Sequence, residues 1–165
     1  MLCPACGFDN LVGADVCDNC GSELAGGVPQ PATTFQGQLL GVRVRDLAMS
    51  EAHLVDIGSD ASDAIGRMQR EDADCVLVMD GDHLVGVFTD RDAVLKVAGR
   101  NTGPVAIRDV MTRDPVVLRD DDSVAVAIHK MAVGGFRHVP IVRDGRPTGV
   151  ISAKVIFQHL AERLD

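Results

Sequence analysis

The sequence of 165 residues contains no tryptophan and no tyrosine, so phenylalanine is its only aromatic residue. A core must therefore be built mainly from aliphatic side chains and Met, for which a hydrophobic content of 46% is sufficient. The length allows one ordinary domain and a small appendage. No apolar run approaches the roughly 18 residues that cross a bilayer, and the start of the chain lacks the basic and apolar regions of a secretory signal. We therefore expect a cytoplasmic protein without a membrane partner.

Positive charge is also scarce, because 16 Lys and Arg stand against 24 Asp and Glu, for a formal net charge of -8. The basic residues are scattered and form no local patch. A nucleic acid or an anionic membrane would be repelled by such a surface. The sequence therefore predicts no nucleic-acid partner.

Catalytic motifs are missing as well. The sequence has no G-x-S-x-G, no P-loop, no H-E-x-x-H and no dinucleotide G-x-G-x-x-G, and its five histidines show no metal-ligand spacing. Two of them, His129 and His159, fall on expected helices and are expected to face solvent. These observations predict a protein that is not an enzyme.

Four of the five cysteines lie in the first twenty residues, as two C-x-x-C pairs: Cys3 with Cys6, and Cys17 with Cys20. A glycine follows each pair and permits the positive φ that closes such a turn. Two turns of this kind supply four thiolates to one metal and leave no coordination position open, so the pattern predicts a structural Zn(II) site. The remaining cysteine, Cys75, is expected to be a buried strand residue.

Residues 1–24 resemble the zinc ribbons that begin many bacterial and archaeal proteins, with their CPxCG and CxxCG turns. Iron in a rubredoxin-like site is the alternative, but such sites are wrapped in aromatic residues and this segment offers only Phe8. The segment has no Lys or Arg, and its four acidic side chains give it a formal charge of -4. Such a charge favours a docking surface for a protein partner, or an inert folded cap, over a DNA-binding ribbon.

Residues 25–39 are rich in Gly, Pro and Thr and carry no charge, which predicts a flexible linker. The rest of the chain is duplicated. A shift of 63 residues, which places residue 44 over residue 107, aligns VRDL with IRDV, AIGRM with AIHKM, CVLVM with HVPIV and GVFT with GVIS, without a gap. This register predicts two tandem copies, at 40–103 and 104–165.

Each copy is expected to follow the order β-α-β-β-α. The apolar spacing and the turn residues predict elements at equivalent places in the two copies. The expected elements are strands at 53–57 and 116–119, helices at 61–70 and 124–133, strands at 75–79 and 139–142, second strands ending in GVFT and GVIS, and closing helices at 90–98 and 153–164.

The second copy, MTRDPVVLRDDDSVAVAIHKMAVGGFRHVPIVRDGRPTGVIS, resembles a CBS domain of the cystathionine β-synthase type, and the first copy resembles its partner. The resemblance covers about 42–165. It implies an α/β (α+β) fold in which a tandem CBS-domain pair, or Bateman module, has pseudo-twofold symmetry and two clefts between the copies. In the family these clefts commonly take AMP, ADP or ATP, and in some members S-adenosylmethionine, NAD or cyclic dinucleotides. CBS pairs also often associate as dimers.

In the family, a G-h-h-[ST]-x-x-D motif (h is apolar) provides a carboxylate for the ribose hydroxyls, while its hydroxyl and the following helix start face phosphate. The first copy reads GVFTDRD and is complete, with Thr89 and Asp92. The second reads GVISAKV, so it keeps Ser152 but has Val155 in place of the acid. Thr89 and Asp92 also form a helix-capping pattern, and the two roles stay open.

Family members often draw phosphate-binding basic residues from the strand entry of the opposite copy. The second copy has Arg137 and His138 there, before Val139 and Pro140, whereas the first copy has Asp74, which would repel a phosphate. One cleft is therefore expected to be equipped and the other degenerate. A surface ion pair for Arg137 and a half-buried strand position for His138 are the alternatives.

The remaining candidates concern adenine and turn contacts. Apolar residues of the central strands are candidate walls for adenine, although each is also explained as ordinary core: Val76, Leu77, Val139 and Pro140. Thr112 is expected to contact the ligand or to cap a turn.

The leading hypothesis is a stand-alone regulatory module that senses an adenosine nucleotide, with Mg(II) left open and the ribbon or the linker conveying the signal to a protein partner. The alternatives are a ligand-free dimerisation scaffold and a DNA-binding regulator led by the ribbon, which the acidic charge disfavours.

Overall fold

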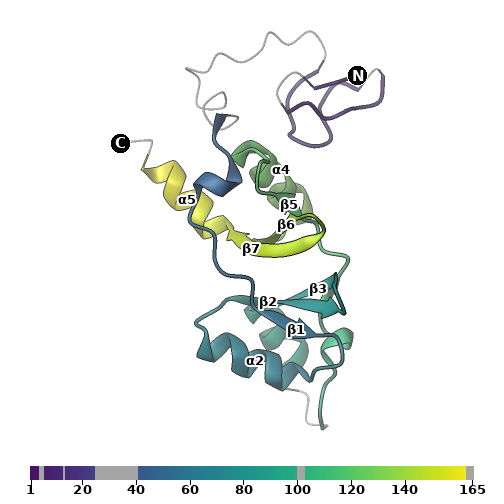
Figure 1. Ribbon diagram of the computed structural model, residues 1–165, viewed down its shortest axis with the longest axis vertical. Coiled ribbons are helices and arrows are strands. Elements are labelled where there is room, and N and C mark those ends of the chain that lie inside the picture. The colour runs from purple at the N-terminus through teal and green to yellow at the C-terminus, as the bar shows by residue number, and fades with distance from the viewer. Residues whose placement is uncertain (4–5, 13, 25–40, 100–102, 163–165) are drawn as a thin grey trace. The chain divides into compact units, whose positions relative to one another are not determined.

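The computed structural model describes residues 1–3, 6–12, 14–24, 41–99 and 103–162, which form two compact units. Unit 1 comprises the described parts of 1–50 and 150–165 together with 118–141, and unit 2 comprises the described parts of 51–117 and 142–149. Figure 1 labels their helices and strands. The linker predicted at 25–39 lies outside the described residues.

Unit 2 is built on a four-stranded sheet with the order β1-β2-β3-β4. Strand β1 runs parallel to β2, while β2, β3 and β4 are antiparallel neighbours. A tight turn in which Gly81 has a φ of 58° joins β2 to β3. The strands span Leu54–Asp56 (β1), Cys75–Asp80 (β2), His83–Thr89 (β3) and Thr112–Arg113 (β4).

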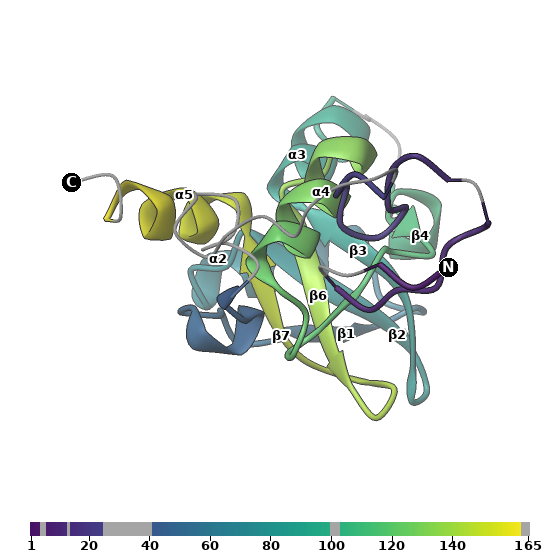
Figure 2. The same cartoon turned by 90° about the horizontal axis from the view of Figure 1, so that it is seen from above.

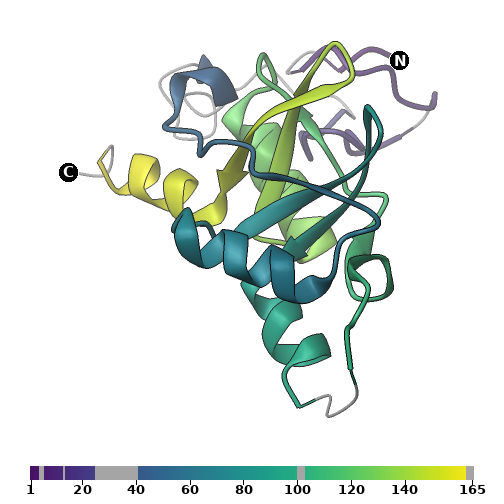
Figure 3. The same ribbon diagram turned by 60° about the horizontal axis from the view of Figure 1, so that its bottom comes forward.

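Helix α2 (Ala61–Arg70) lies along this sheet and spans the residues that the sequence predicts. Its apolar positions repeat at helical spacing, so one face can be buried. Ala61, Ala64 and Met68 on that face pack with the buried residues of β2 and β3. Figure 3 shows the backbone of this helix beside the sheet.

The closing helix of the first copy starts as predicted but changes character. Its first turn, α3 (Asp90–Asp92), is α-helical, and the next residues form the π-helical turn η2 (Ala93–Val97). The amide of Ala98 donates to the carbonyl of Ala93 at 2.9 Å, which is the wider spacing of a π turn. Such turns are frequent at functional sites.

Unit 1 contains most of the second copy, except its described residues before 118 and residues 142–149, where β6 and β7 meet, which belong to unit 2. A three-stranded sheet has the order β5-β6-β7. Helix α4 lies beside β6 in Figure 2, and its buried side chains share one core with β6 and β7. Helix α4 ends at Gly135, whose φ is 66°. The elements span Leu118–Arg119 (β5), Val124–Gly134 (α4), His138–Arg143 (β6), Arg146–Ser152 (β7) and Ala153–Ala161 (α5).

The short 3₁₀ helices at the start of the two copies pack in exchanged units. Helix η1 (Val44–Asp46) begins the first copy, but Val44 is buried in the core of unit 1, and its amide donates to the carbonyl of Asp122 at 2.9 Å. Helix η3 (Ile107–Asp109) begins the second copy, but Ile107 is buried in unit 2, and its amide donates to the carbonyl of Ser59 at 3.0 Å. The two bonds are related by the shift of 63 residues that relates the copies.

The predicted order β-α-β-β-α is confirmed in both copies. The sequence analysis did not anticipate η1, η3 or β4. Among the helices that the structure describes, none combines the length and apolarity required to traverse a membrane.

Candidate functional site

The four N-terminal cysteines form one cluster. Their Sγ atoms all lie within 4.8 Å of one another, with Cys3 and Cys20 at 3.6 Å and Cys6 and Cys17 at 3.6 Å. A tetrahedral zinc site with Zn–S distances of roughly 2.3 Å has sulfur–sulfur distances of about 3.8 Å. The four sulfur atoms and their spacing therefore fit a metal ion that is bound by four thiolates.

Two equivalent turns hold this cluster. The amide of Gly7 donates to the carbonyl of Cys3 at 2.8 Å, and the amide of Gly21 donates to that of Cys17 at 2.8 Å. The two glycines have φ values of 75° and 71°, which confirms the predicted positive φ. An L side chain rarely adopts this conformation, and the turns therefore favour glycine.

Burial and hydrogen bonds act in opposite directions on the thiols. Burial raises the pKa of Cys20 to about 12. Burial also favours the neutral thiol of Cys17, but donors from the backbone of Cys20 and Asn19 and from the side chain of Asn10 lower its pKa to about 7. Donors aimed at a sulfur stabilise a thiolate, which is the form that binds a metal.

The described residues of the N-terminal segment 1–24 pack against helix α4 within unit 1. A Cβ atom added to Gly21 would lie only 2.7 Å from Nδ1 of His129. The expectation that His129 and His159 face solvent is wrong, because both are half-buried. The Nε2 atom of His159 is buried and has no hydrogen-bond partner among the described residues. The ring of His129 instead lies next to Gly21, between the N-terminal segment and helix α4.

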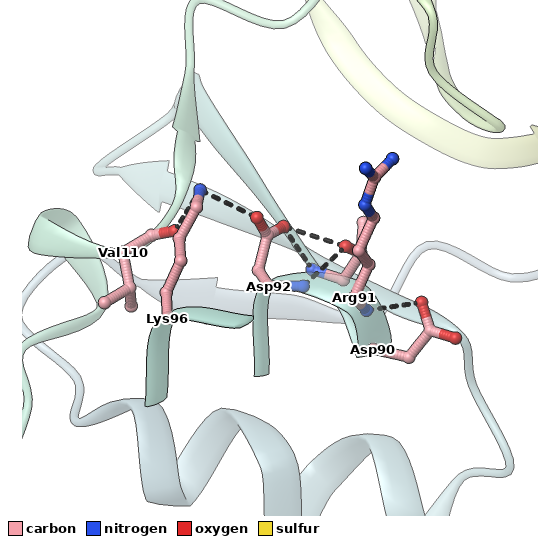
Figure 4. A network of polar contacts seen from close by, with 6 residues as sticks. Asp90, Arg91, Asp92, Lys96 and Val110 are labelled. Carbon is pink, nitrogen blue, oxygen red and sulfur yellow. Dashed lines mark hydrogen bonds and ion pairs between the residues drawn. The ribbon is translucent and has the colours of Figure 1, made fainter. Parts of the chain in front are cut away.

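Thr89 and Asp92 form a reciprocal cap at the end of β3 (Figure 4). The amide of Asp92 donates to Oγ1 of Thr89 at 3.2 Å. In return, the amide of Thr89 donates to Oδ2 of Asp92 at 3.0 Å, and its hydroxyl donates to the same oxygen at 2.8 Å. The capping role that the sequence left open is therefore confirmed, while the ribose role stays a prediction.

The second oxygen of Asp92 is held by a lysine that the sequence analysis did not single out. The ammonium of Lys96 lies 2.7 Å from Oδ1 of Asp92 and donates to the carbonyl of Val110 at 2.8 Å. Asp92 itself is only 8% exposed. Its spacing of four residues from Lys96 on an expected helix was the available signal, because such residues face each other.

The matching site in the second copy has a cap but no acid. The hydroxyl of Ser152 accepts from the amide of Val155 at 3.3 Å. Ser152 is half-buried, as is the aliphatic side chain of Val155. This site therefore presents no carboxylate to a diol.

The basic candidates lie at the entry to β6. Arg137 is exposed and His138 is half-buried. The carbonyl of Arg137 accepts from the amide of Ala153 at 2.8 Å, and the carbonyl of Asp74 accepts from the amide of Asp90 at 3.0 Å. The two copies therefore have the same backbone hydrogen bond at this position. Arg137 belongs to unit 1 and Asp92 to unit 2, and their pairing at one nucleotide stays a prediction.

The candidate adenine walls are core residues. Val76, Leu77 and Val139 are fully buried, and Pro140 is buried as well. Thr112 is exposed on β4, opposite Val87. Core packing accounts for the four buried residues, and their contacts with a base stay predictions.

Cys75 is buried at the start of β2, as expected. Burial raises the pKa of its thiol to about 12, and the charges of Asp74 and Asp90 act in the same direction. A thiol with so high a pKa is a poor nucleophile at neutral pH.

Comparisons with known proteins agree with this fold. Residues 44–99 and 107–162 each match the CBS domain. The chain is 34% identical over 125 residues to the CBS domain-containing protein CBSCBSPB2 of Arabidopsis thaliana, a match that covers 74% of this chain and 23% of that protein. The chain thus spans about a quarter of the length of this relative.

Solved structures give the same result. The structure of CBSX2 in complex with AMP is similar with a TM-score of 0.60 and 24% identity, over 76% of this chain and 100% of that one. The CBS domain pair of protein MJ0100, in complex with 5-methylthioadenosine and S-adenosyl-L-methionine, is similar with a TM-score of 0.67 and 20% identity, over 74% of this chain and 98% of that one. At these identities the two structures establish a common fold.

Proposed function

The chain belongs to the CBS-domain family, and from this premise we propose that it is a regulatory module that binds an adenosine nucleotide of the AMP, ADP or ATP class. The observation that carries the proposal is the buried carboxylate of Asp92, which Thr89 holds at the end of β3. A fixed carboxylate can accept hydrogen bonds from the two hydroxyls of a ribose. The complex of CBSX2 with AMP is consistent with this ligand class.

The proposed site takes its phosphate contacts from the second copy. We propose that the guanidinium of Arg137 and the ring of His138 contact the phosphate, and that Thr112 contacts the ligand. The second site, with Ser152 and Val155, has no acid for the ribose. We therefore expect one nucleotide for each chain, with or without Mg(II).

Calorimetric titration with AMP, ADP, ATP and S-adenosylmethionine tests the proposal. Asp92→Ala and Arg137→Ala should each weaken binding by about 1–3 kcal/mol, because each removes a charged hydrogen-bond partner. Val155→Ala is the matched control and should leave the affinity unchanged. The absence of binding heat with all four ligands, for folded and zinc-loaded protein, would refute the function.

We further propose that the cysteine cluster is a structural Zn(II) site. Zinc supplies a fixed tetrahedral centre that holds the two turns together, and the four thiolates of Cys3, Cys6, Cys17 and Cys20 leave no position for a substrate. Metal analysis should find one zinc for each chain, and Cys17→Ser should reduce this content. Iron in place of zinc would overturn the assignment.

The ribbon is also the proposed contact for a protein partner. Its surface presents Leu11 and Val12, which are 81% and 93% exposed, and all of its charged side chains are acidic. Exposed apolar residues among like charges favour a partner segment that is apolar and basic. We expect Leu11→Ser with Val12→Ser to abolish capture of such a partner while the zinc content stays unchanged.

A ligand-free dimerisation scaffold is the second candidate. Its support comes from the closing helices, where Val94, Leu95 and Phe157 are 65%, 67% and 71% exposed. Val94 and Phe157 occupy equivalent places in the two copies. A stable homodimer that is purified without nucleotide and binds none, and that Phe157→Ser dissociates, would favour this function over the sensor.

A further inference from the structure

The carboxylate of Asp92 is almost fully occupied by donors from its own unit. Its Oδ2 atom accepts from the amide and the hydroxyl of Thr89, and its Oδ1 atom lies 2.7 Å from the ammonium of Lys96 (Figure 4). A carboxylate offers about four acceptor positions, two on each oxygen. Three of these positions are taken, which leaves one on Oδ1.

A ribose diol needs two acceptor positions for its two hydroxyl donors. One of the three existing contacts must therefore give way if both hydroxyls are to bind Asp92. The two contacts from Thr89 are local and hold the start of the closing helix, and their loss would undo the cap. The contact from Lys96 is the one that can be exchanged, because its long side chain is 39% exposed and can turn away from Oδ1.

Lys96 also has a second partner that remains in place. Its ammonium donates to the carbonyl of Val110 at 2.8 Å, and Val110 follows η3 in the segment that leads to Thr112. Lys96 can keep that bond when a hydroxyl takes its position on Oδ1. The second copy has no equivalent contact, because its corresponding residues are Val155 and His159.

We propose that Lys96 sets the affinity of the first-copy site by competing with the ribose hydroxyls for the carboxylate of Asp92. The inference rests on the proposed function, because it requires a ribose at Asp92. In the absence of ligand, the ammonium neutralises the buried carboxylate. On binding, the diol displaces it, so the binding of a ribonucleoside includes the cost of breaking this ion pair.

The test uses the neutral nucleoside adenosine, which separates the diol from any phosphate contact. Replacement of Lys96 by Met removes the competitor at nearly constant length. The variant should bind adenosine about fivefold more tightly than the parent chain, the factor that corresponds to about 1 kcal/mol for a partly exposed ion pair. It should bind 2′,3′-dideoxyadenosine no more tightly than the parent does, because that nucleoside cannot displace the lysine.

Two further variants complete the design. Lys96→Gln keeps a donor for the carbonyl of Val110 and should show the same gain, which preserves the test if Lys96→Met does not fold. Arg91→Gln removes the same charge from the neighbouring turn, where the guanidinium points away from Asp92 in Figure 4, and should show no gain. Thermal unfolding without ligand should give a lower midpoint for Lys96→Met, because Asp92 loses its counter-ion.

The possible outcomes distinguish a failure of the Lys96 proposal from a failure of the proposed nucleotide binding. If the parent chain binds adenosine and Lys96→Met binds it equally or more weakly, competition is refuted while the nucleotide site stands. An equal gain for Arg91→Gln would also refute it, because a general charge effect would then explain the result. If the parent chain binds no adenosine, AMP or ATP, the proposed function and the role of Lys96 fail together.

Discussion

Gly7 and Gly21 have nearly the same backbone conformation but different surroundings. Their φ values are 75° and 71°, so an alanine meets the same backbone strain at both positions. A Cβ atom at Gly7 would have no neighbour within 4 Å, whereas one at Gly21 would lie 2.7 Å from Nδ1 of His129. The two alanine variants therefore share one cost and differ in the contact with α4.

The expected magnitudes follow from these two costs. The left-handed conformation costs an alanine roughly 1 kcal/mol, so Gly7→Ala should weaken zinc binding about fivefold. Gly21→Ala has the same backbone strain and, in addition, an overpacking cost of about 1 kcal/mol. This cost lies at the low end of the usual range for overpacking because the half-buried ring of His129 can turn aside. We expect Gly21→Ala to weaken zinc binding about 30-fold.

Competition for zinc with a chromophoric chelator measures these differences in the full chain. His129→Ala in the Gly21→Ala background should recover the overpacking part and return the affinity to that of Gly7→Ala. His129→Ala in the Gly7→Ala background is the control and should change nothing. Equal affinities for Gly7→Ala and Gly21→Ala, or no recovery in the double variant, would refute the packing of the ribbon on α4.

Two further predictions concern the core and the buried thiol. Val44→Ala should cost about 2 kcal/mol and Ile107→Ala about 3 kcal/mol of unfolding free energy. In hydrogen exchange, Val44→Ala should deprotect α4 and Ile107→Ala should deprotect α2; the opposite assignment would refute the exchange of η1 and η3. The pKa of Cys75 is raised from 9.0 to about 12 in the folded chain, so the neutral thiol stabilises the fold below pH 9 and this contribution is lost as the pH rises from 9 towards 12. Chemical denaturation of Cys75→Ala should show a smaller loss of stability between pH 9 and 11 than the parent chain, and an equal loss would contradict the assignment.

Much of the candidate site could be predicted from the sequence, because its signals are local. The two C-x-x-C-G turns placed four sulfurs at one point and gave both glycines a positive φ. The T-x-x-D pattern predicted a cap, which the structure contains. The partner of Asp92 was missed because the spacing to Lys96 fits an ion pair on any helix, and only the position of Val110 shows where that ammonium is held.

The sequence by itself determined the two copies, their order β-α-β-β-α and the bounds of α2, because hydrophobic periodicity and turn residues act over a few neighbouring positions. Only the tertiary structure decided in which hydrophobic core each of the 3₁₀ helices η1 and η3 is buried. Val44 and Ile107 are apolar residues at equivalent places in a repeat, and each could be buried against either copy. The structure places Val44 with the second copy and Ile107 with the first. Each side chain is buried against residues that lie far away in the sequence, and each amide is hydrogen-bonded to one of them, so no local pattern could reveal the choice.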